Sequence, residues 1–280
     1  MTIPDAQRPE QSTPMATEDL TLPLDGGAIH ISQDGPRDAP ALLLIHGSAS
    51  STRSWDALVP LLTESHRLIR IDLLGHGESA KPSNGDYAIP TQAHRAGVIL
   101  DRLGITKAIV VAHSSGGLTA TALAEHRPDL VKALSLINTG PRMEAVIPQD
   151  LSITPEQWPH LTDTQLREAA STAFTRPGYD PPQFILDDIR KMTFHTFTTT
   201  MHESAKYLSD NPIPPRLSSL SLPLQVIFGE SDRRWNSSHA TEYQAVPNTH
   251  LNLLPGIGHT PILESPPETA ALLLAFTTSL

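Results

Sequence analysis

The chain contains no cysteine, and aromatic residues make up only 5% of its composition. The absence of cysteine excludes a disulfide framework, a thiolate nucleophile and metal sites with cysteine ligands. Acidic residues outnumber basic ones by 30 to 20, so the net charge is −10 and no basic surface is available for nucleic acid. No run of about 18 apolar residues occurs, and the sequence therefore predicts no membrane span.

The first 17 residues contain three prolines and no apolar core of the kind found in signal peptides. We expect 1–17 to form a flexible leader without a catalytic role, with Met15 as an alternative start. Without an export signal, the sequence predicts a cytoplasmic protein. Its oligomeric state is not predicted.

Short apolar runs alternate with helix-like segments along most of the chain. Two runs flank the turn at 25–27 and predict a β-hairpin, and six more are typical of strands buried on both faces: 20–24, 28–32, 41–45, 68–71, 108–111, 133–137, 224–228 and 251–254. Helix-like segments lie between them, at 54–62, 91–103, 117–125, 237–246 and 267–278. This alternation predicts an α/β fold: an open, mainly parallel eight-stranded sheet with helices on both faces.

The alternation stops between 140 and 221, where helix-like pieces cover 163–174, 182–194 and 197–208. We expect a helical cap inserted into a core made of 18–139 and 222–280. The cap holds seven of the thirteen Phe, Trp and Tyr residues, and as a group these predict an apolar pocket roof, although packing is the commoner role for any one of them. The side chains expected at the pocket are His113, Trp158, Phe184, Phe194, Phe197 and Trp235.

The segment 112–117, AHSSGG, follows an apolar strand run and precedes a helix-like run. A sharp turn between a strand and a helix would present the Ser114 hydroxyl at the carboxyl edge of the sheet, where ligands bind. The amides at the start of the following helix would stabilise negative charge beside it. A purely local turn rich in serine and glycine is the simpler alternative.

Steric considerations favour Ser114 over Ser115 as the nucleophile. The turn strains the nucleophile's backbone and requires small residues two positions before and after it. Ala112 and Gly116 meet this requirement for Ser114, whereas His113 stands at the first of these positions for Ser115. Ala112 departs from the glycine that is usual there.

A serine nucleophile needs a base and a carboxylate that orients the base, and two candidates follow other strand runs. Asp232 comes after the run 224–228, and His259 lies in the glycine-rich loop after 251–254. The order Ser, Asp, His along the chain is the one expected of this architecture. We therefore assign Ser114 as nucleophile, Asp232 as the orienting acid, and His259 as base and then acid.

Position along the chain separates these candidates from the alternatives. Glu230 is the second choice for the acid, whereas Asn138 follows the run 133–137 without any carboxylate. Of the thirteen histidines, His250 lies at the opposite end of the last strand and His239 on an expected helix. Neither is placed to meet Ser114.

Two backbone N–H groups should stabilise the oxyanion, one from the residue after the nucleophile and one from the loop after an earlier strand. Ser115 supplies the first. Ser48 follows the run 41–45 through His46-Gly47 and is expected to supply the second. A tight turn at Gly47 would also account for this sequence, and such a turn would aim the amide.

These features together resemble the α/β-hydrolase-fold proteins, a large superfamily of capped, single-domain members. The similarity extends from about residue 20 to the end of the chain. It is carried, in the family's order, by 46–48 (HGS), 72–79 (DLLGHGES), 112–117, 229–232 (GESD), 258–259 (GH), Glu264 and Pro266. The resemblance is specific for the fold but not for the substrate.

The resemblance implies several possible reactions, and single residues argue against some of them. Haloalkane dehalogenases and epoxide hydrolases of this fold use an aspartate nucleophile where this chain has Ser114. Proline iminopeptidases typically carry GGSWG at the turn, and carbon–carbon bond hydrolases often carry a glycine-rich oxyanion loop where this chain has SASS at 48–51. Both therefore fit poorly.

We predict a serine hydrolase that cleaves an ester, lactone or thioester of a small to medium apolar substrate through an acyl-enzyme on Ser114. The expected partner is this small molecule, without a cofactor or a metal. The alternative is a receptor-like ligand-binding protein, or a lyase or perhydrolase, with little ester turnover, because the fold does not determine the reaction.

Overall fold

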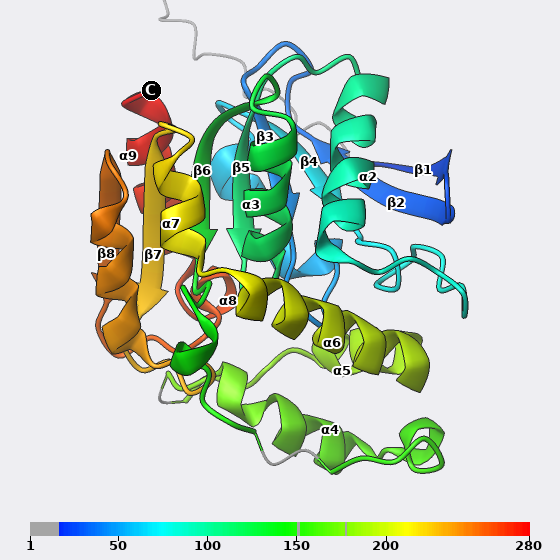
Figure 1. Cartoon of the computed structure of the whole chain (residues 1–280). Helices are drawn as coiled ribbons and strands as arrows, with labels where there is room; N and C mark the ends of the chain where they lie inside the picture. The colour runs from blue at the N-terminus through cyan, green and yellow to red at the C-terminus, as the bar shows by residue number, and fades with distance from the viewer. Residues whose placement is uncertain (1–16, 150–151, 177) are drawn as a thin grey trace, which may run out of the picture.

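A single sheet of eight strands organises the molecule (Figure 1). The computed structural model describes residues 17–149, 152–176 and 178–280, so most of the expected leader and Met15 lie outside it. The strands, in chain order, are β1 (Glu18–Leu24), β2 (Gly27–Asp34), β3 (Ala41–Ile45), β4 (Arg67–Ile71), β5 (Ala108–His113), β6 (Val131–Ile137), β7 (Leu224–Gly229) and β8 (Thr249–Leu254).

The spatial order of the strands is β1-β2-β4-β3-β5-β6-β7-β8. The β1–β2 hairpin and the β2–β4 pair are antiparallel, and every other pair is parallel. The predicted fold class, an open and mainly parallel α/β sheet fronted by a hairpin, is confirmed. The strand order reverses at β3, so the strands beside it end at a common edge where a site can form.

Both faces of the sheet are covered, which explains the continuous apolar runs. Along β3, Leu43 and Ile45 join the larger hydrophobic cluster, whereas Leu42 and Leu44 join the smaller one. Successive strand residues point to opposite faces, so one strand contributes to both clusters. The larger cluster lies under α2 (Ile89–Arg102) and α3 (Gly116–His126), and the smaller under α1 (Val59–Leu62) and α9 (Pro266–Thr278).

Two expected helices differ in the structure. The segment 54–62 divides into a 3-10 turn, η1 (Thr52–Trp55), and the short α1, in whose first turn Pro60 lacks the N–H of a continuous helix. The segment 237–246 forms a 3-10 helix, η5 (Ser237–Ala245). Its buried residues Ala240 and Tyr243 are three positions apart, which matches the three residues per turn of this helix type.

The helices α4 (Asp163–Ala170), α5 (Gln183–Lys191) and α6 (Phe194–Asp210) lie against the carboxyl ends of the strands (Figure 1). The stretch between β6 and β7 also contains α7 (Ile213–Ser218) and three 3-10 turns, η2 (Met143–Ala145), η3 (Trp158–His160) and η4 (Ser171–Ala173). Capping boxes at Thr162 and Thr193 begin α4 and α6. The α7 helix packs on α3 of the core, although it lies within the range 140–221 expected for the cap.

Candidate active site

Ser114 occupies the turn between β5 and α3. Its backbone has φ of +53°, in the left-handed region that non-glycine residues rarely adopt. The turn is held from both sides, because the Ser114 N–H donates to the Ile137 carbonyl at 2.9 Å and the Thr139 hydroxyl donates to the Ser114 carbonyl at 2.9 Å. A strained conformation held by its surroundings in this way is typical of functional residues.

The end of β3 also requires glycine at position 116. A Cβ on Gly116 would lie 2.4 Å from the His46 carbonyl oxygen and 2.6 Å from that of Ile45. The turn that carries Ser114 therefore lies directly against the end of β3.

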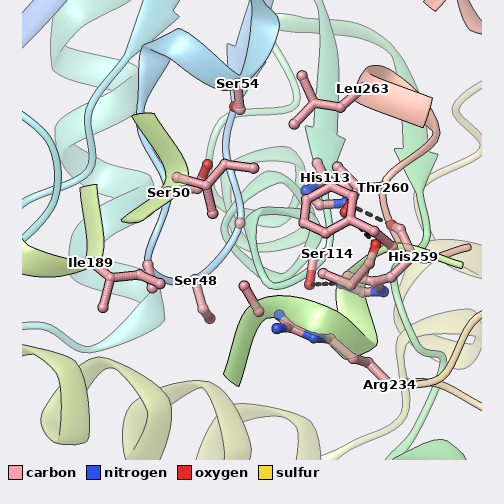
Figure 2. A pocket seen from close by; sticks show the side chains of 16 residues that line it. Ser48, Ser50, Ser54, His113, Ser114, Ile189, Arg234, His259, Thr260 and Leu263 are labelled. Carbon is pink, nitrogen blue, oxygen red and sulfur yellow. Dashed lines mark hydrogen bonds between the residues drawn. The ribbon is translucent and has the colours of Figure 1, made fainter. Parts of the chain in front are cut away.

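The structure brings Ser114, His259 and Asp232 together in one hydrogen-bonded chain. Figure 2 shows the contact between Ser114 and His259. His259 Nε2 lies 2.9 Å from Ser114 Oγ, and His259 Nδ1 lies 2.8 Å from Asp232 Oδ2. All three side chains are buried. With its proton on Nδ1, the ring donates to Asp232 and leaves Nε2 free to accept the Ser114 proton.

Hydrogen-bond donors around the Asp232 carboxylate keep it ionised. Its Oδ1 accepts the backbone N–H groups of Arg234 at 2.7 Å and Trp235 at 3.1 Å, and its Oδ2 accepts Asn138 Nδ2 at 2.7 Å. Burial opposes the charge, but His259 and these donors outweigh burial and hold the pKa of Asp232 below its usual value. The carboxylate can therefore stabilise a charged His259 ring.

Asn138 is a site residue that the sequence analysis noted only because it is not a carboxylate. It stands at the end of β6 with φ of +47°, a conformation that asparagine tolerates better than most residues. Besides binding Asp232, it donates to the Gly258 carbonyl at 3.2 Å and accepts the Gly229 N–H at 3.1 Å. One side chain thus connects the loops that carry the acid and the base. The only indication of this role in the sequence was the position of Asn138 directly after a predicted strand.

The alternative acid and base lie away from this chain of hydrogen bonds. Glu230 is exposed, although it is only two residues from Asp232. His239 pairs with Glu242 at 2.7 Å, and the ring of His250 packs near Phe276. None of the three contacts Ser114.

Ser48 and Ser115 lie side by side next to Ser114. Their hydroxyl oxygens are 2.8 Å apart, which joins the loop after β3 to the turn after β5. Neither backbone N–H donates to another of the residues that the structure describes. Two unused amides beside the nucleophile are available to a ligand oxygen, as the prediction of an oxyanion hole requires.

Two cavities meet at Ser114. The larger has a volume of about 510 Å³ and lies between the strand ends and the helices α4 and α6, with a mostly apolar lining that includes Leu118, Leu166, Met201 and Leu208. The smaller has a volume of about 70 Å³. Ser48, His259 and Arg234 line both. The predicted pocket consisted of aromatic side chains and His113, and did not include this aliphatic lining.

Three of the predicted pocket side chains line the larger cavity: Trp158, Phe197 and Trp235. His113 lines the smaller one. Phe184 and Phe194 line neither, which corrects the prediction for both. The Arg53 guanidinium lies over the Phe184 ring, 4.9 Å from the ring centroid. The Phe194 ring packs edge-on against Trp158, with the centroids 5.8 Å apart.

His113 is the residue before Ser114, but its side chain contacts the loop of His259. Its Nε2–H donates to the His259 carbonyl at 2.8 Å, so it holds the loop of the proposed base. Burial and then the neighbouring His259 ring lower the pKa of His113 to about 3. Burial and the ring of His46 lower the pKa of His76 to about 3 as well. Both rings are neutral at neutral pH.

This burial predicts acid-sensitive stability. A histidine in the unfolded chain takes up a proton near pH 6.5, whereas the folded His76 and His113 take one up only near pH 3. As the pH falls from 6.5 toward 3, each of these two histidines therefore lowers the free energy of unfolding by about 1.4 kcal/mol per pH unit. Above pH 6.5 they have no effect on it. His76→Gln should lessen the loss of unfolding free energy between about pH 7.5 and pH 5.5 by roughly 1.4 kcal/mol, measured by urea denaturation. Identical pH dependences would contradict the assignment.

In 17–149, 152–176 and 178–280, no three His, Asp or Glu side chains are grouped as metal ligands would be. Within the same ranges, no helix combines the length and the apolar character needed to cross a membrane.

Comparisons with known proteins agree with this architecture. The chain is 28% identical over 95% of its length, and over 100% of the relative, to a putative 2-succinyl-6-hydroxy-2,4-cyclohexadiene-1-carboxylate synthase of Bacillus subtilis. It is 26% identical to Lipase 3 of a Moraxella species, covering 91% of this chain and 82% of the lipase. The structure of an N-acyl homoserine lactonase superposes with a TM-score of 0.78 at 19% identity, covering 93% of this chain and 97% of the lactonase. A family model described as the alpha/beta hydrolase fold matches residues 40–266. The chain belongs to the α/β-hydrolase fold family.

Proposed function

We propose that this protein is a serine hydrolase that cleaves an ester, lactone or thioester of a small to medium substrate through an acyl-enzyme on Ser114. The observation that carries the proposal is the hydrogen-bonded chain from Ser114 through His259 to Asp232 at the junction of two cavities. Nucleophile, base and orienting acid are within reach of one another, as acyl transfer requires.

In the proposed reaction, Ser114 Oγ attacks the substrate carbonyl while His259 Nε2 takes the hydroxyl proton. The negative oxygen forms hydrogen bonds with the amides of Ser48 and Ser115, each worth on the order of 3 kcal/mol in the transition state. His259 then gives its proton to the leaving group. A water molecule activated by the same ring attacks the acyl-enzyme, which releases the acid and restores Ser114.

The larger cavity suits the acyl part of the substrate. Its apolar lining would remove an acyl chain from water, and the smaller cavity, which also reaches Ser114, would take the leaving group. We include in the proposal that 140–221 form a cap over a core of 18–139 and 222–280. Relatives named as lipases support ester cleavage as the general class of reaction.

A second candidate function is a lyase. The putative synthase of Bacillus subtilis is similar over its entire length, including the region of the cap, and its name describes a synthase and not a hydrolase. The same nucleophile and base could serve proton transfer in an elimination. Ester turnover separates the two candidates, and also separates both from a receptor that binds tightly but turns over slowly.

The test is a panel of p-nitrophenyl esters with acyl chains of increasing length. A hydrolase should release many equivalents of p-nitrophenol per enzyme, with kcat in the range of about 1–1,000 per second for the preferred chain. The release is followed by absorbance. A single equivalent, or none, across the whole panel would contradict the proposal.

Cap variants on the same panel test the role of the larger cavity. Phe197→Ala enlarges the space that Phe197 now fills, so the preferred acyl chain should become longer and its relative kcat/KM should change by about tenfold. Phe184→Ala is the matched control, because this cap phenylalanine lies outside both cavities. Its chain-length profile should remain that of the unmodified protein. Equal profiles for both variants would exclude the larger cavity as the acyl site.

A further inference from the structure

Arg234 is the only Lys, Arg, Asp or Glu among the described residues that line the two cavities. It follows Asp232 by two positions, and its backbone N–H binds that carboxylate. In Figure 2 its guanidinium extends toward the space between Ser48 and Ser114. A full positive charge therefore lies beside the proposed nucleophile, in surroundings that are otherwise mostly apolar.

The side-chain partners of Arg234 are neutral, and both belong to the cap. Its Nε donates to Thr172 Oγ1 at 3.3 Å, and its Nη2 donates to the Ala169 carbonyl at 3.5 Å, which are long distances for hydrogen bonds. Ion pairs are common elsewhere in the molecule, for example at Arg70 and Arg216. No carboxylate within 17–149, 152–176 and 178–280 forms an ion pair with Arg234.

Asp232 offsets part of the charge of this arginine but does not bind its guanidinium. Burial lowers the pKa of the Arg234 guanidinium, and the charge of Asp232 opposes that effect. Both oxygens of Asp232, however, already accept hydrogen bonds from Asn138, His259 and two backbone amides. A guanidinium stays protonated in proteins, and that of Arg234 is partly buried, with only neutral hydrogen-bond acceptors among the described residues. Its N–H groups are therefore available to an anionic ligand.

We infer that Arg234 binds a free carboxylate of the substrate, positioned a few bonds from the carbonyl that Ser114 attacks. This inference rests on the proposed function and narrows its substrate class to monoesters, or the corresponding lactone or thioester derivatives, of a diacid. The planar fork of the guanidinium matches a carboxylate with two parallel hydrogen bonds. A doubly charged phosphate would call for a second cation, and the described lining of the cavities provides none.

Two small esters with the same four-carbon acyl chain test this inference. Monoethyl succinate carries the free carboxylate, and ethyl butanoate does not, so their kcat/KM values in a pH-stat assay isolate its effect. We expect a preference of at least about tenfold for monoethyl succinate, in line with a hydrogen bond to a charged group. Arg234→Gln should abolish the preference, and Arg234→Lys, which keeps the charge but not the fork, should retain part of it.

Arg233→Gln is the matched control, because Arg233 is the preceding residue and is exposed. It should leave the preference unchanged. An equal loss for both esters in Arg234→Gln would overturn the inference, because that result is expected if Arg234 only holds the cap through Thr172 and Ala169. The absence of any preference in the unmodified protein would also overturn it.

A binding measurement separates this inference from the hydrolase proposal. In the Ser114→Ala background, calorimetry should show monoethyl succinate binding at least about tenfold more tightly than ethyl butanoate, and adding Arg234→Gln should remove the difference. If the unmodified protein hydrolyses neither ester but this preference in binding is found, the hydrolase proposal fails and the anion site stands. Equal binding of the two esters overturns the anion site, whatever the rate of hydrolysis.

Discussion

Replacing Ser114 with alanine is expected to lower kcat for ester hydrolysis by about 10⁶-fold and to abolish labelling by a fluorophosphonate probe. The substitution removes only the hydroxyl group, and the proposed acyl-enzyme cannot form without it. The turn itself should persist, because its hydrogen bonds to Ile137 and Thr139 use backbone atoms of Ser114. Unfolding free energy should therefore change by no more than about 1 kcal/mol.

Ser115→Ala is the matched control for this experiment. It removes a hydroxyl one position away, together with its contact to Ser48, but keeps the backbone amide proposed for the oxyanion hole. Labelling should continue, with kcat within about tenfold of the unmodified protein. Labelling of Ser114→Ala but not of Ser115→Ala would assign the nucleophile to Ser115 instead.

Asp232→Asn should reduce kcat by about 10⁴-fold. The carboxylate accepts hydrogen bonds at both oxygens, two backbone amides at Oδ1 and the groups of Asn138 and His259 at Oδ2. An asparagine must place its NH₂ group at one of these positions, where two donors already point. The His259 ring then loses its orientation or its proton on Nδ1, or the turn at 232–235 loses its support. Steady-state kinetics of the purified variant measure the effect.

The neighbouring carboxylate provides the comparison. Glu230→Gln makes the same chemical change two residues earlier, on an exposed side chain, and should leave kcat within about threefold. Unfolding free energy measured for both variants distinguishes lost catalysis from lost folding, because the Asp232 variant should lose only about 1–3 kcal/mol. A large loss of kcat in Glu230→Gln, with little in Asp232→Asn, would transfer the role of the acid to Glu230.

Much of the fold could be predicted because its signals are local. A strand buried on both faces must be apolar at every position, as in the run Ala41–Ile45, and such runs are visible without knowledge of their neighbours. The sharp turn at Ser114 likewise requires small residues nearby in the sequence. The order of Ser114, Asp232 and His259 was then enough to predict which strand ends carry the candidate site.

Contacts between distant segments could not be predicted in the same way. Asn138 joins loops that lie 91 and 120 positions further along the chain. Gly116 is also required by the end of β3, about 70 positions earlier. Of the cap aromatics, Phe197 lines the cavity but Phe184 does not, because Arg53 from the core covers the ring of Phe184. Both residues are phenylalanines, and only their packing in the folded protein distinguishes them.

The sequence by itself determined the sheet, its covering helices and the strand ends that carry the proposed nucleophile, acid and base. These follow from apolar periodicity and backbone geometry, which act over a few residues. The tertiary structure decided which side chains surround the nucleophile, above all that Arg234 faces a cavity without a carboxylate partner among the described residues. Burial and the pairing of charges depend on segments brought together by folding, so they exist only in the folded molecule.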